Sequence, residues 1–438
     1  MGAAVFDLFF SYVYKFLHQY LGVRRPLSQR EKTLAWMFSL YDFNYTLSGI
    51  FLTVFLFKKN HDLGIPVLFY LTQFTAIVPA FWLGGHLSKR FGNLLSYQLG
   101  FAFNAMVFAA TLLLRENAPD HPYWLGTLAG LGIGFYFLGE HSLTLEETSE
   151  KSRDYFLSLT TFFTSVFCIL APQISGWLIV SFGGNTPGAG TANAETSLWG
   201  YYLVFAIALS LYLVLFFKSF QFMAKPTGRG FYFWKVLTFR RNSDWDRFMG
   251  AQFFLGLRNG VFWFLPALLV YQVSNNEAVV GGYSTFANLL GVLTSYGLSL
   301  WAKAENRRQG LYISSLILGL SGVGLALQVA YSSLFFYVIL AMVGGTWFQV
   351  VFGAFSFTLL EKAREARRHR IEYLAVRELP LALGRILSLV VLYWGQSRFG
   401  ETGLRLSVLT LSFCPMGIFL FFPRSKMHEI QAARAEKS

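Results

Sequence analysis

The residues of this sequence that could do chemistry are charged side chains inside apolar segments. Asp42 lies within the apolar segment 34–57, with Asn44 close behind it, and Arg258 and Arg385 each lie within a later apolar segment. A charged side chain in the hydrocarbon of a bilayer costs about 3 kcal/mol on insertion scales, so such residues usually pair or serve a function. A carboxylate there can carry a proton, and a guanidinium can hold an anionic group. We therefore take Asp42, Arg258 and Arg385 as functional candidates.

The sequence contains no other motif that indicates a cofactor site, a metal site or a catalytic nucleophile. The segment GLGIGFYFLGE contains GxGxG, but it lies inside an apolar segment and follows no predicted strand, so it is not a dinucleotide-binding loop. The sequence has no Walker loop, its 7 His show no metal-binding spacing, and no nucleophile motif is recognisable. We therefore expect that the protein is not an enzyme and holds no metal and no cofactor. Since no Walker loop is present to bind ATP, we expect that any work the protein does is driven by an ion gradient, and that the ion is a proton.

The composition indicates a polytopic membrane protein. Of the 438 residues 54% are apolar and only 13% are charged, whereas about one-quarter of a soluble domain is charged. Cys168 and Cys414 both lie in apolar segments and are expected to pack as small hydrophobic residues. We expect a multi-pass protein of the plasma (inner) membrane.

Twelve apolar segments are long enough to cross a hydrocarbon core of roughly 30 Å. They are residues 34–57, 65–87, 94–114, 123–145, 157–180, 198–218, 248–272, 281–302, 311–331, 334–360, 374–394 and 404–422. The longest polar interruption, 219–247, separates two sets of six. The sequence therefore predicts an all-α protein with two six-helix bundles, 34–218 and 248–422, joined by a central loop at 219–247.

The flanking segments are predicted to lie at or outside the membrane surface. Within residues 1–33, the apolar run 3–21 is interrupted by Asp7 and Lys15, which is typical of an amphipathic helix in the interface. We expect no cleavable signal peptide. Residues 423–438 form a short basic tail.

The basic residues indicate the orientation of the chain. Most of the 36 Lys and Arg fall in segments that share one side if the N-terminus is cytoplasmic, and cytoplasmic loops are enriched in these residues. We therefore expect both termini in the cytoplasm. The net charge of +13 and the basic, aromatic central loop fit anionic lipid headgroups, so we expect lipid contact and no nucleic acid.

The turn GGHLSKRFGNLL, residues 84–95, resembles the cytoplasmic loop of the major facilitator superfamily between its second and third spans. The matching residues are Gly85, Leu87, Arg90 and Gly92. Lys89 stands where that family has an aspartate. The resemblance implies the superfamily fold, in which two pseudo-symmetric six-helix bundles enclose a central cavity, and it implies that the loop 84–95 forms an inner gate. The reversed charge at Lys89 puts the usual pairing of that gate in doubt.

A second resemblance lies in the fifth predicted span. Ala171, Pro172, Ser175 and Gly176 are similar to a Gly-Pro-x-x-Gly-Gly pattern of the superfamily's antiporters. This favours export, although small residues and a proline also serve helix packing alone.

The resemblance also implies which spans line the cavity, namely the first, fourth, seventh and tenth. For proton coupling we expect Asp42 and Glu140. For the substrate cavity the expected residues are Asn44, Tyr45, Tyr136, Arg258, Asn259, Trp263, Trp347, Gln349 and, from the eleventh span, Arg385. The inner-gate residues are Gly85, Lys89, Arg90 and Gly92. In the eleventh span, Arg377 and Glu378 are shallow, and we expect them in the interfacial region.

Asp42 and Arg258 are expected at similar depth. At 1.5 Å per residue they would lie about 12 and 15 Å from the inner ends of their spans, so a carboxylate and a guanidinium could pair across the cavity. One hypothesis is that the pair takes part in transport, with substrate binding to Arg258 and thereby freeing Asp42 to take a proton. The alternatives are a structural ion pair and a bond from Asp42 to a neighbouring backbone.

These observations predict a secondary active transporter that moves a small solute by alternating access. We expect proton coupling, export or antiport of an anionic or amphipathic substrate, and a monomer. The alternatives are a proton-coupled symporter or a uniporter for uptake, a flippase for a lipid-linked substrate, and, in a different class, a membrane receptor that does not transport.

Overall fold

The computed structural model of the chain describes residues 27–59, 61–149, 152–183, 198–223, 230–238, 243–301, 307–362 and 369–421. The expected interfacial helix at 3–21 and the tail at 423–438 lie outside these residues. Throughout the described ranges the secondary structure is helical, with turns and short connections and no strand. This confirms the all-α fold class that was expected from the apolar segments.

The described residues form twelve helices of at least ten residues and three shorter elements. The helices of the first half are α2 (Gln29–Lys58), α3 (Gly64–Phe91), α4 (Asn93–Leu114), α5 (Pro122–Glu147), α6 (Arg153–Phe182) and α7 (Trp199–Ser219). The helices of the second half are α9 (Ser243–Phe262), α10 (Leu265–Ser274), α11 (Glu277–Trp301), α12 (Arg307–Leu327), α13 (Tyr331–Lys362) and α14 (Arg370–Phe413), followed by the 3-10 helix η3 (Cys414–Leu420). The short helix α8 (Phe233–Leu237) lies between the halves in sequence, and the 3-10 helix η1 (Arg115–Asp120) follows α4.

Nine stretches of the described residues are long and apolar enough to cross a membrane, where the sequence predicted twelve spans. The expected spans at 123–145 and 281–302 coincide with α5 and α11, which are not among the nine. The two expected spans at 374–394 and 404–422 fall in one stretch because α14 contains a bend at Gly400. The expected span at 248–272 is divided into α9 and α10, and Pro266 stands in the first turn of α10.

The bend in α14 reverses the chain. Gly400 has φ 57°, a left-handed conformation that glycine adopts without the strain of a side chain. Beyond it the helix returns along itself, since the Ser407 hydroxyl donates to the Val391 carbonyl at 3.4 Å. A Cβ on Gly403 would meet the Gly395 backbone, so these two limbs pack very closely.

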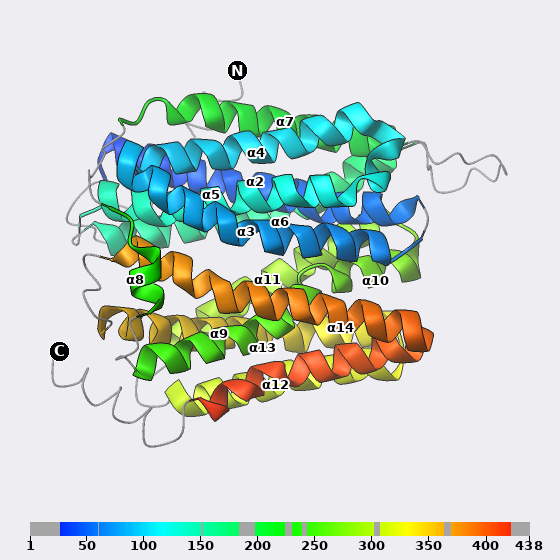
Figure 1. Cartoon of the computed structure of the whole chain (residues 1–438). Coiled ribbons are helices and arrows are strands. Elements are labelled where there is room, and N and C mark those ends of the chain that lie inside the picture. The colour runs from blue at the N-terminus through cyan, green and yellow to red at the C-terminus, as the bar shows by residue number, and fades with distance from the viewer. Residues whose placement is uncertain are drawn as a thin grey trace.

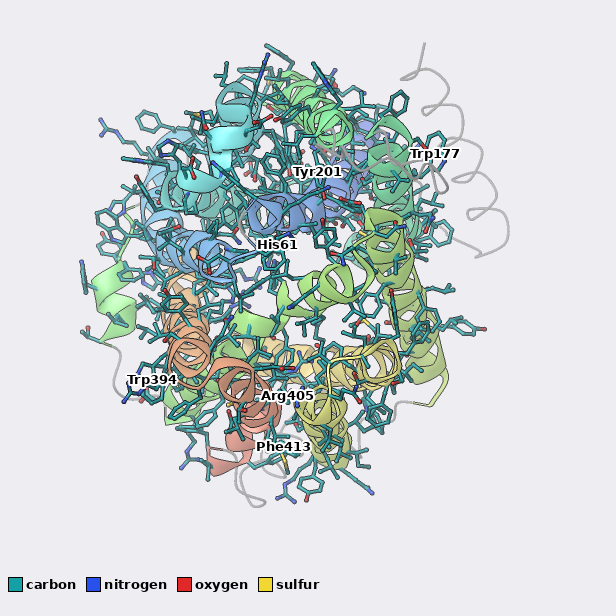
Figure 2. All side chains as sticks on the ribbon, turned by 90° about the vertical axis from the view of Figure 1, so that its right-hand side faces the viewer. His61, Trp177, Tyr201, Trp394, Arg405 and Phe413 are labelled. Carbon is teal, nitrogen blue, oxygen red and sulfur yellow. The ribbon has the colours of Figure 1, made fainter. Side chains whose placement is uncertain are left out.

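The helices form two groups that lie side by side (Figure 1). Helices α2 to α7 lie together in the upper part of that view, and α9 to α14 lie in the lower part. Helix α3 packs against α14 and α6 packs against α11 across the boundary between the groups. The view along the bundle in Figure 2 shows the same division, with Tyr201 in the upper group and Phe413 in the lower one.

The α6–α11 contact explains the small residues of the fifth predicted span. A Cβ on Gly176 would lie 2.7 Å from the Glu277 carbonyl oxygen, and a Cβ on Gly281 would lie 2.5 Å from that of Pro172. Pro172 has no N–H for the Cys168 carbonyl, and the Asn288 amide of α11 donates to that carbonyl at 2.6 Å. The pattern therefore joins the two groups of helices.

A matched pair of glycines tests how tightly the first group packs. A Cβ on Gly139 of α5 would lie 2.7 Å from backbone atoms of Tyr97 in α4, whereas one on Gly297 of α11 would have nothing within 4 Å. We expect Gly139→Ala to cost about 1–3 kcal/mol, because the backbones must separate. Gly297→Ala should leave the midpoint of thermal unfolding unchanged or slightly higher. Equal midpoints for both variants in detergent would contradict this packing.

Candidate functional site

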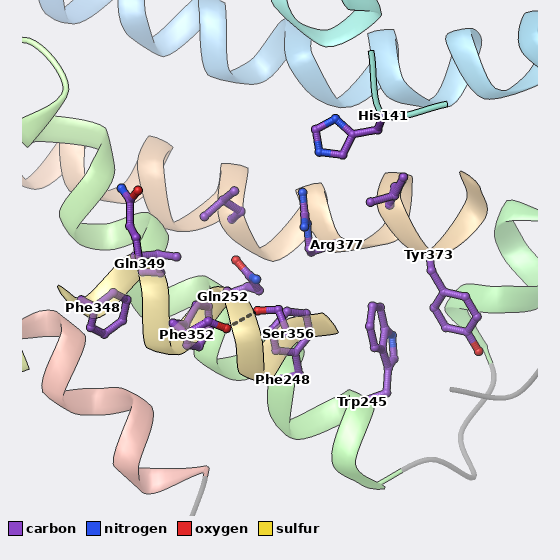
Figure 3. A pocket seen from close by; sticks show the side chains of 14 residues that line it. His141, Trp245, Phe248, Gln252, Phe348, Gln349, Phe352, Ser356, Tyr373 and Arg377 are labelled. Carbon is purple, nitrogen blue, oxygen red and sulfur yellow. Dashed lines mark hydrogen bonds between the residues drawn. The ribbon is translucent and has the colours of Figure 1, made fainter. Parts of the chain in front are cut away.

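A cavity of about 380 Å³ lies at the boundary between the two groups of helices. Three helices of the second group, α9, α13 and α14, form most of its wall, and His141 of α5 enters from the first group (Figure 3). The cavity lies toward the end of the bundle at which α2 and α14 begin. We call this end the basic end, because the sequence places most Lys and Arg on that side, and the other the opposite end.

The cavity combines flat apolar walls with a few polar groups. The aromatic residues that line it are Trp245, Phe248, Phe348, Phe352 and Tyr373. The polar residues that line it are His141, Gln252, Gln349, Ser356 and Arg377. A mostly apolar wall with a small number of placed polar groups is typical of a site for a small organic molecule.

His141 and Arg377 face each other across this cavity, as Figure 3 shows. The His141 side chain is 44% exposed, although it lies inside the bundle, because its free surface is the cavity. Gln252 is 4% exposed, and within the described part of the chain its amide makes no hydrogen bond. An unpaired buried amide of this kind is costly, so the Gln252 side chain is suited to a bound ligand, and the exposed face of the His141 ring lies in the same cavity.

Arg377 belongs to a row of charges along α14. Its guanidinium lies 3.4 Å from one oxygen of Glu378, and the other oxygen of Glu378 lies 3.8 Å from Arg385. One carboxylate is thus shared by two guanidinium groups, which leaves one positive charge in excess. Arg377, which had been expected in the interfacial region, forms part of the wall of the larger cavity.

A layer of aromatic residues separates this cavity from a second one. The indole Nε1 of Trp263 donates to the Tyr45 hydroxyl at 3.0 Å, which joins α9 to α2. The guanidinium of Arg385 lies over the rings of Phe74 and Trp263, at 5.1 and 5.9 Å from their centroids. The expected cavity residues Tyr45, Trp263 and Arg385 are therefore brought together at the boundary between the groups.

The second cavity, of about 170 Å³, lies on the far side of this layer. Its lining includes Tyr45, Gly49, Thr53, Tyr70 and Trp263. Along α9 and α10 the residues of the larger cavity end at Leu255, and those of the smaller cavity begin at Trp263. The two cavities therefore follow one another along the axis of the bundle.

The opposite end is closed by contacts between the groups. Lys58 of α2 lies 2.9 Å from Glu277 of α11, and the Tyr201 hydroxyl donates to the same carboxylate oxygen at 2.8 Å. The rings of Tyr70 and Phe264 stack with their centroids 4.6 Å apart. These contacts join the two groups of helices at that end, beside the smaller cavity.

Asp42 is held within the first group of helices. Its carboxylate accepts a hydrogen bond from the Thr164 hydroxyl of α6 at 2.9 Å, and it interacts electrostatically with Glu140 of α5. Glu140 in turn lies 4.0 Å from the His141 ring. Of the two carboxylates that were expected to carry protons, Glu140 therefore lies beside the residue that enters the larger cavity, and Asp42 acts on it electrostatically.

The expected pair of Asp42 with Arg258 is not formed in the described structure. Arg258 lies over the Phe262 ring, 5.1 Å from its centroid, and Phe262 stacks on Tyr337 of α13. The similar depth of the two residues does not bring them together, because Arg258 is directed along the second group while Asp42 is bonded to α6.

Asn44 and Tyr136 are buried inside the first group and do not line either cavity. The Asn44 amide donates to the Ala208 carbonyl of α7 at 2.9 Å. The Tyr136 ring stacks on Tyr41 with centroids 3.3 Å apart, and both residues are buried. These two expected cavity residues are directed toward neighbouring helices of the first group, Asn44 toward α7 and Tyr136 toward α2.

The tenth predicted span contributes one of its two expected residues. Gln349 lines the larger cavity, whereas the Trp347 indole is directed to Gly310 of α12. Asn259 is half-buried, and none of the hydrogen bonds among the described side chains involves its amide.

The expected gate loop contacts the second group at the basic end. Lys89 lies 3.5 Å from Glu372 near the start of α14, and both side chains are buried. The reversed charge at Lys89 thus has an acidic partner across the boundary. Gly85 packs against the Phe231 ring, Arg90 lies over Phe91, and Gly92 ends α3 with φ 100°.

Sequence reasoning missed two parts of this arrangement. Trp245 was assigned to the central loop at the headgroups, yet it lines the larger cavity with Phe248. Glu277 was not singled out, although a lone carboxylate at the start of an apolar span, with Lys58 near the end of another, is a detectable signal. Among the described residues no group of three His, Cys, Asp or Glu could hold a metal ion.

Two curated proteins are similar to the chain, and no family model matches it. The Bacillus subtilis (strain 168) protein YqgE, called uncharacterized, is 28% identical over 352 residues, which are 80% of this chain and 79% of that protein. An uncharacterized Geobacillus stearothermophilus protein from the sodM 3′ region is 31% identical over 144 residues, which are 33% of this chain and 67% of that protein.

Several solved structures share the arrangement of helices. The Escherichia coli fucose:proton symporter FucP superposes with a TM-score of 0.60 at 16% identity, covering 90% of this chain and 97% of that one. The nucleoside transporter NupG superposes with a TM-score of 0.64 at 14% identity, covering 89% of this chain and 98% of that one. A D-xylose-proton symporter superposes with a TM-score of 0.63 at 15% identity, covering 90% of this chain and 97% of that one. At these identities the likeness concerns the fold.

Proposed function

The chain has the fold of the major facilitator superfamily and belongs to one family with the Geobacillus protein, and from this premise we propose that it is a secondary transporter. It moves a small solute across the membrane by alternating access, in which one group of helices rocks against the other around a site between them. The fold by itself does not identify a function, so the proposal depends on the site.

The observation that carries this proposal is the cavity of about 380 Å³ between the groups, together with the closure of the opposite end. Its volume is within the range of about 300–1,000 Å³ that is usual for small-molecule sites. The Lys58–Glu277 ion pair and the Tyr70–Phe264 stack close the opposite end. A site between two bundles, reached from one end and closed at the other, is what alternating access requires of one of its states.

Proton coupling is the second part of the proposal. Asp42 and Glu140 lie close enough to interact, and Glu140 lies beside His141 in the cavity wall. Two neighbouring carboxylates repel each other when both are ionised, so a proton on one of them stabilises the pair. The FucP and xylose proteins are named as proton symporters, which is consistent with a proton as the coupling ion here.

The direction of transport is proposed from the charges of the solute and of Glu140. A negative solute next to Glu140 is repelled when that carboxylate is ionised, so it binds best together with a proton. This favours symport. The export that Pro172 and Gly176 suggested loses its support, because both residues are engaged in the contact of α6 with α11.

Counterflow in proteoliposomes tests the proposal. We expect vesicles that contain the protein, preloaded with one of D-xylose, uridine or indole-3-acetate, to exchange at least one of them for external labelled solute, and protein-free vesicles to exchange none. An imposed proton gradient should then drive its accumulation. A protein that binds one of these solutes and exchanges none of them would be a receptor, and the proposed function would be wrong.

A further inference from the structure

The larger cavity has a charged side and an apolar side, and this division indicates the chemistry of its ligand. On the charged side, Arg377 of α14 faces His141 of α5 (Figure 3). On the apolar side, the rings of Phe248 and Phe352 belong to the wall, and Trp245 lies in edge contact with Tyr373, with ring centroids 4.7 Å apart. A ligand that matches both sides has a flat apolar body and a negatively charged end.

The charges of α14 favour a single negative charge at the charged end of the ligand, bound together with a proton on Glu140, which lies 4.0 Å from His141. Glu378 compensates only one of the two guanidinium groups that it contacts, so Arg377 and Arg385 together carry one charge without a carboxylate on α14. The Arg377 Nε is buried without a hydrogen-bond partner, which leaves a donor for an anionic oxygen. A guanidinium binds a planar carboxylate through paired donors.

The amide groups of the cavity can complete such a site. Gln252 and Gln349 both line it, and neither makes a hydrogen bond to a described residue. An unpaired amide can donate to an anion or accept from a ring N–H. The open space at Gly353, where a Cβ would have no heavy atom within 4 Å, gives room for the body of the ligand between α13 and α9.

We infer that the larger cavity binds an aromatic monocarboxylate, with its carboxylate between Arg377 and His141 and its ring against Phe248 and Phe352. This inference deepens the proposed function, since it names the substrate class of the same site. A neutral sugar would leave the positive charge without a partner, and a cation would be repelled by Arg377.

Three indole compounds that share a ring and differ in charge test the inference. Binding of indole-3-acetate, indole-3-acetamide and tryptamine to the purified full chain would be measured by calorimetry and by thermal unfolding. We expect indole-3-acetate to bind and to raise the unfolding midpoint, and the amide and the amine to bind at least about tenfold more weakly, as for the loss of one charge-assisted hydrogen-bond pair. Binding of the amide or the amine as strong as that of the acetate, or binding of none of the three, would overturn the inference.

Variants locate the bound anion. We expect Arg377→Gln to weaken indole-3-acetate binding about tenfold or more, and Arg377→Lys to recover part of it, because the charge returns without the paired donors. Arg405→Gln is the matched control, since Arg405 lies elsewhere on α14, where it pairs with Glu401 and donates to the Leu327 carbonyl of α12, and it should leave the affinity unchanged. An affinity unchanged in Arg377→Gln would overturn the placement.

A second variant keeps the test valid if Arg377→Gln does not fold. Gly353→Leu adds a side chain into open space, so the protein should unfold at its usual midpoint while the cavity is filled and binding is lost. Retained binding in Gly353→Leu would contradict the site. Counterflow separates the two proposals: exchange of D-xylose or uridine without binding of indole-3-acetate overturns only this inference, and binding without exchange overturns only transport.

Discussion

Substituting Glu277 by glutamine is expected to open the end of the bundle opposite the larger cavity. Glu277 is 3% exposed and accepts both from Lys58 and from Tyr201, so its charge joins α11 to two helices of the other group. Removing one partner of a buried ion pair costs about 3–5 kcal/mol, because the remaining charge is left uncompensated. The closed state therefore loses stability relative to a state in which Lys58 reaches water.

A cysteine in the smaller cavity measures this opening. With Cys168 and Cys414 replaced by serine, a cysteine at Gly49 would be labelled in vesicles by a membrane-impermeant thiol reagent added on the side of Lys58. Gly49 lines the smaller cavity, and a Cβ there meets only the Tyr45 ring at 3.9 Å. We expect slow labelling in the parent protein and at least about tenfold faster labelling with Glu277→Gln, since 1.4 kcal/mol corresponds to tenfold.

The matched control removes an acidic partner that does not join the two groups. Glu401 pairs with Arg405, and both lie on α14. Glu401→Gln should leave the labelling at Gly49 unchanged. A cysteine at Gly353 in the larger cavity should behave in the reverse sense, with slower labelling from the basic end when Glu277 is changed. Unchanged labelling at both cysteines would contradict the closure of this end by Glu277.

Much of the fold could be predicted because span length and apolar composition are local properties. Each of the expected segments falls on helical residues, from 34–57 in α2 to 404–422 in the part of α14 after Gly400 and in η3, and the seventh is shared by α9 and α10. The breaks were harder to predict. The division of the seventh segment at Trp263 depends on Pro266 and on local packing, and the reversal at Gly400 is one glycine among 40 in the sequence.

The site was predicted less well, because a sequence gives the depth of a residue but not the direction of its side chain. Asp42 and Arg258 have similar depths, yet each is directed to a helix of its own group. Tyr136 was expected in the substrate cavity and Glu140 in proton coupling, and the structure buries Tyr136 against Tyr41 while Glu140 lies 4.0 Å from the His141 ring. Rotation of a helix about its axis is decided by packing against its neighbours, which the sequence alone does not give.

Lys89 departs from the pattern of the resembled family, and this departure could be interpreted only once the residue that Lys89 contacts was known. A lysine in place of the usual aspartate suggested a disrupted gate. Its contact with Glu372 of α14 shows that the acidic residue of this contact is on the other side of the boundary. The sequence holds both residues, but nothing local to either one indicates that they meet.

Loss of coupling in Asp42→Asn and Glu140→Gln is the other large effect that we expect. Each change removes a proton site and also removes a negative charge near the cavity. For an anionic solute the affinity should therefore rise by a few fold, because the repulsion from Glu140 or Asp42 is gone. Accumulation driven by a proton gradient should nevertheless fall to the level of simple exchange, because no proton is carried with the solute.

The measurement combines counterflow and gradient-driven uptake in the same proteoliposomes, for whichever solute the protein exchanges. We expect counterflow to persist in both variants, while the accumulation ratio under a proton gradient falls to about one. Thr164→Val, which removes the hydrogen bond to Asp42 and keeps the carboxylate, should retain coupling with a shifted dependence on pH. Asp120→Asn is the control, since Asp120 is half exposed and pairs with Lys59 at the surface, and it should accumulate solute as the parent does. Full accumulation in both Asp42→Asn and Glu140→Gln would exclude this pair of carboxylates as the proton site, and the search would then turn to Glu378 between its two arginines.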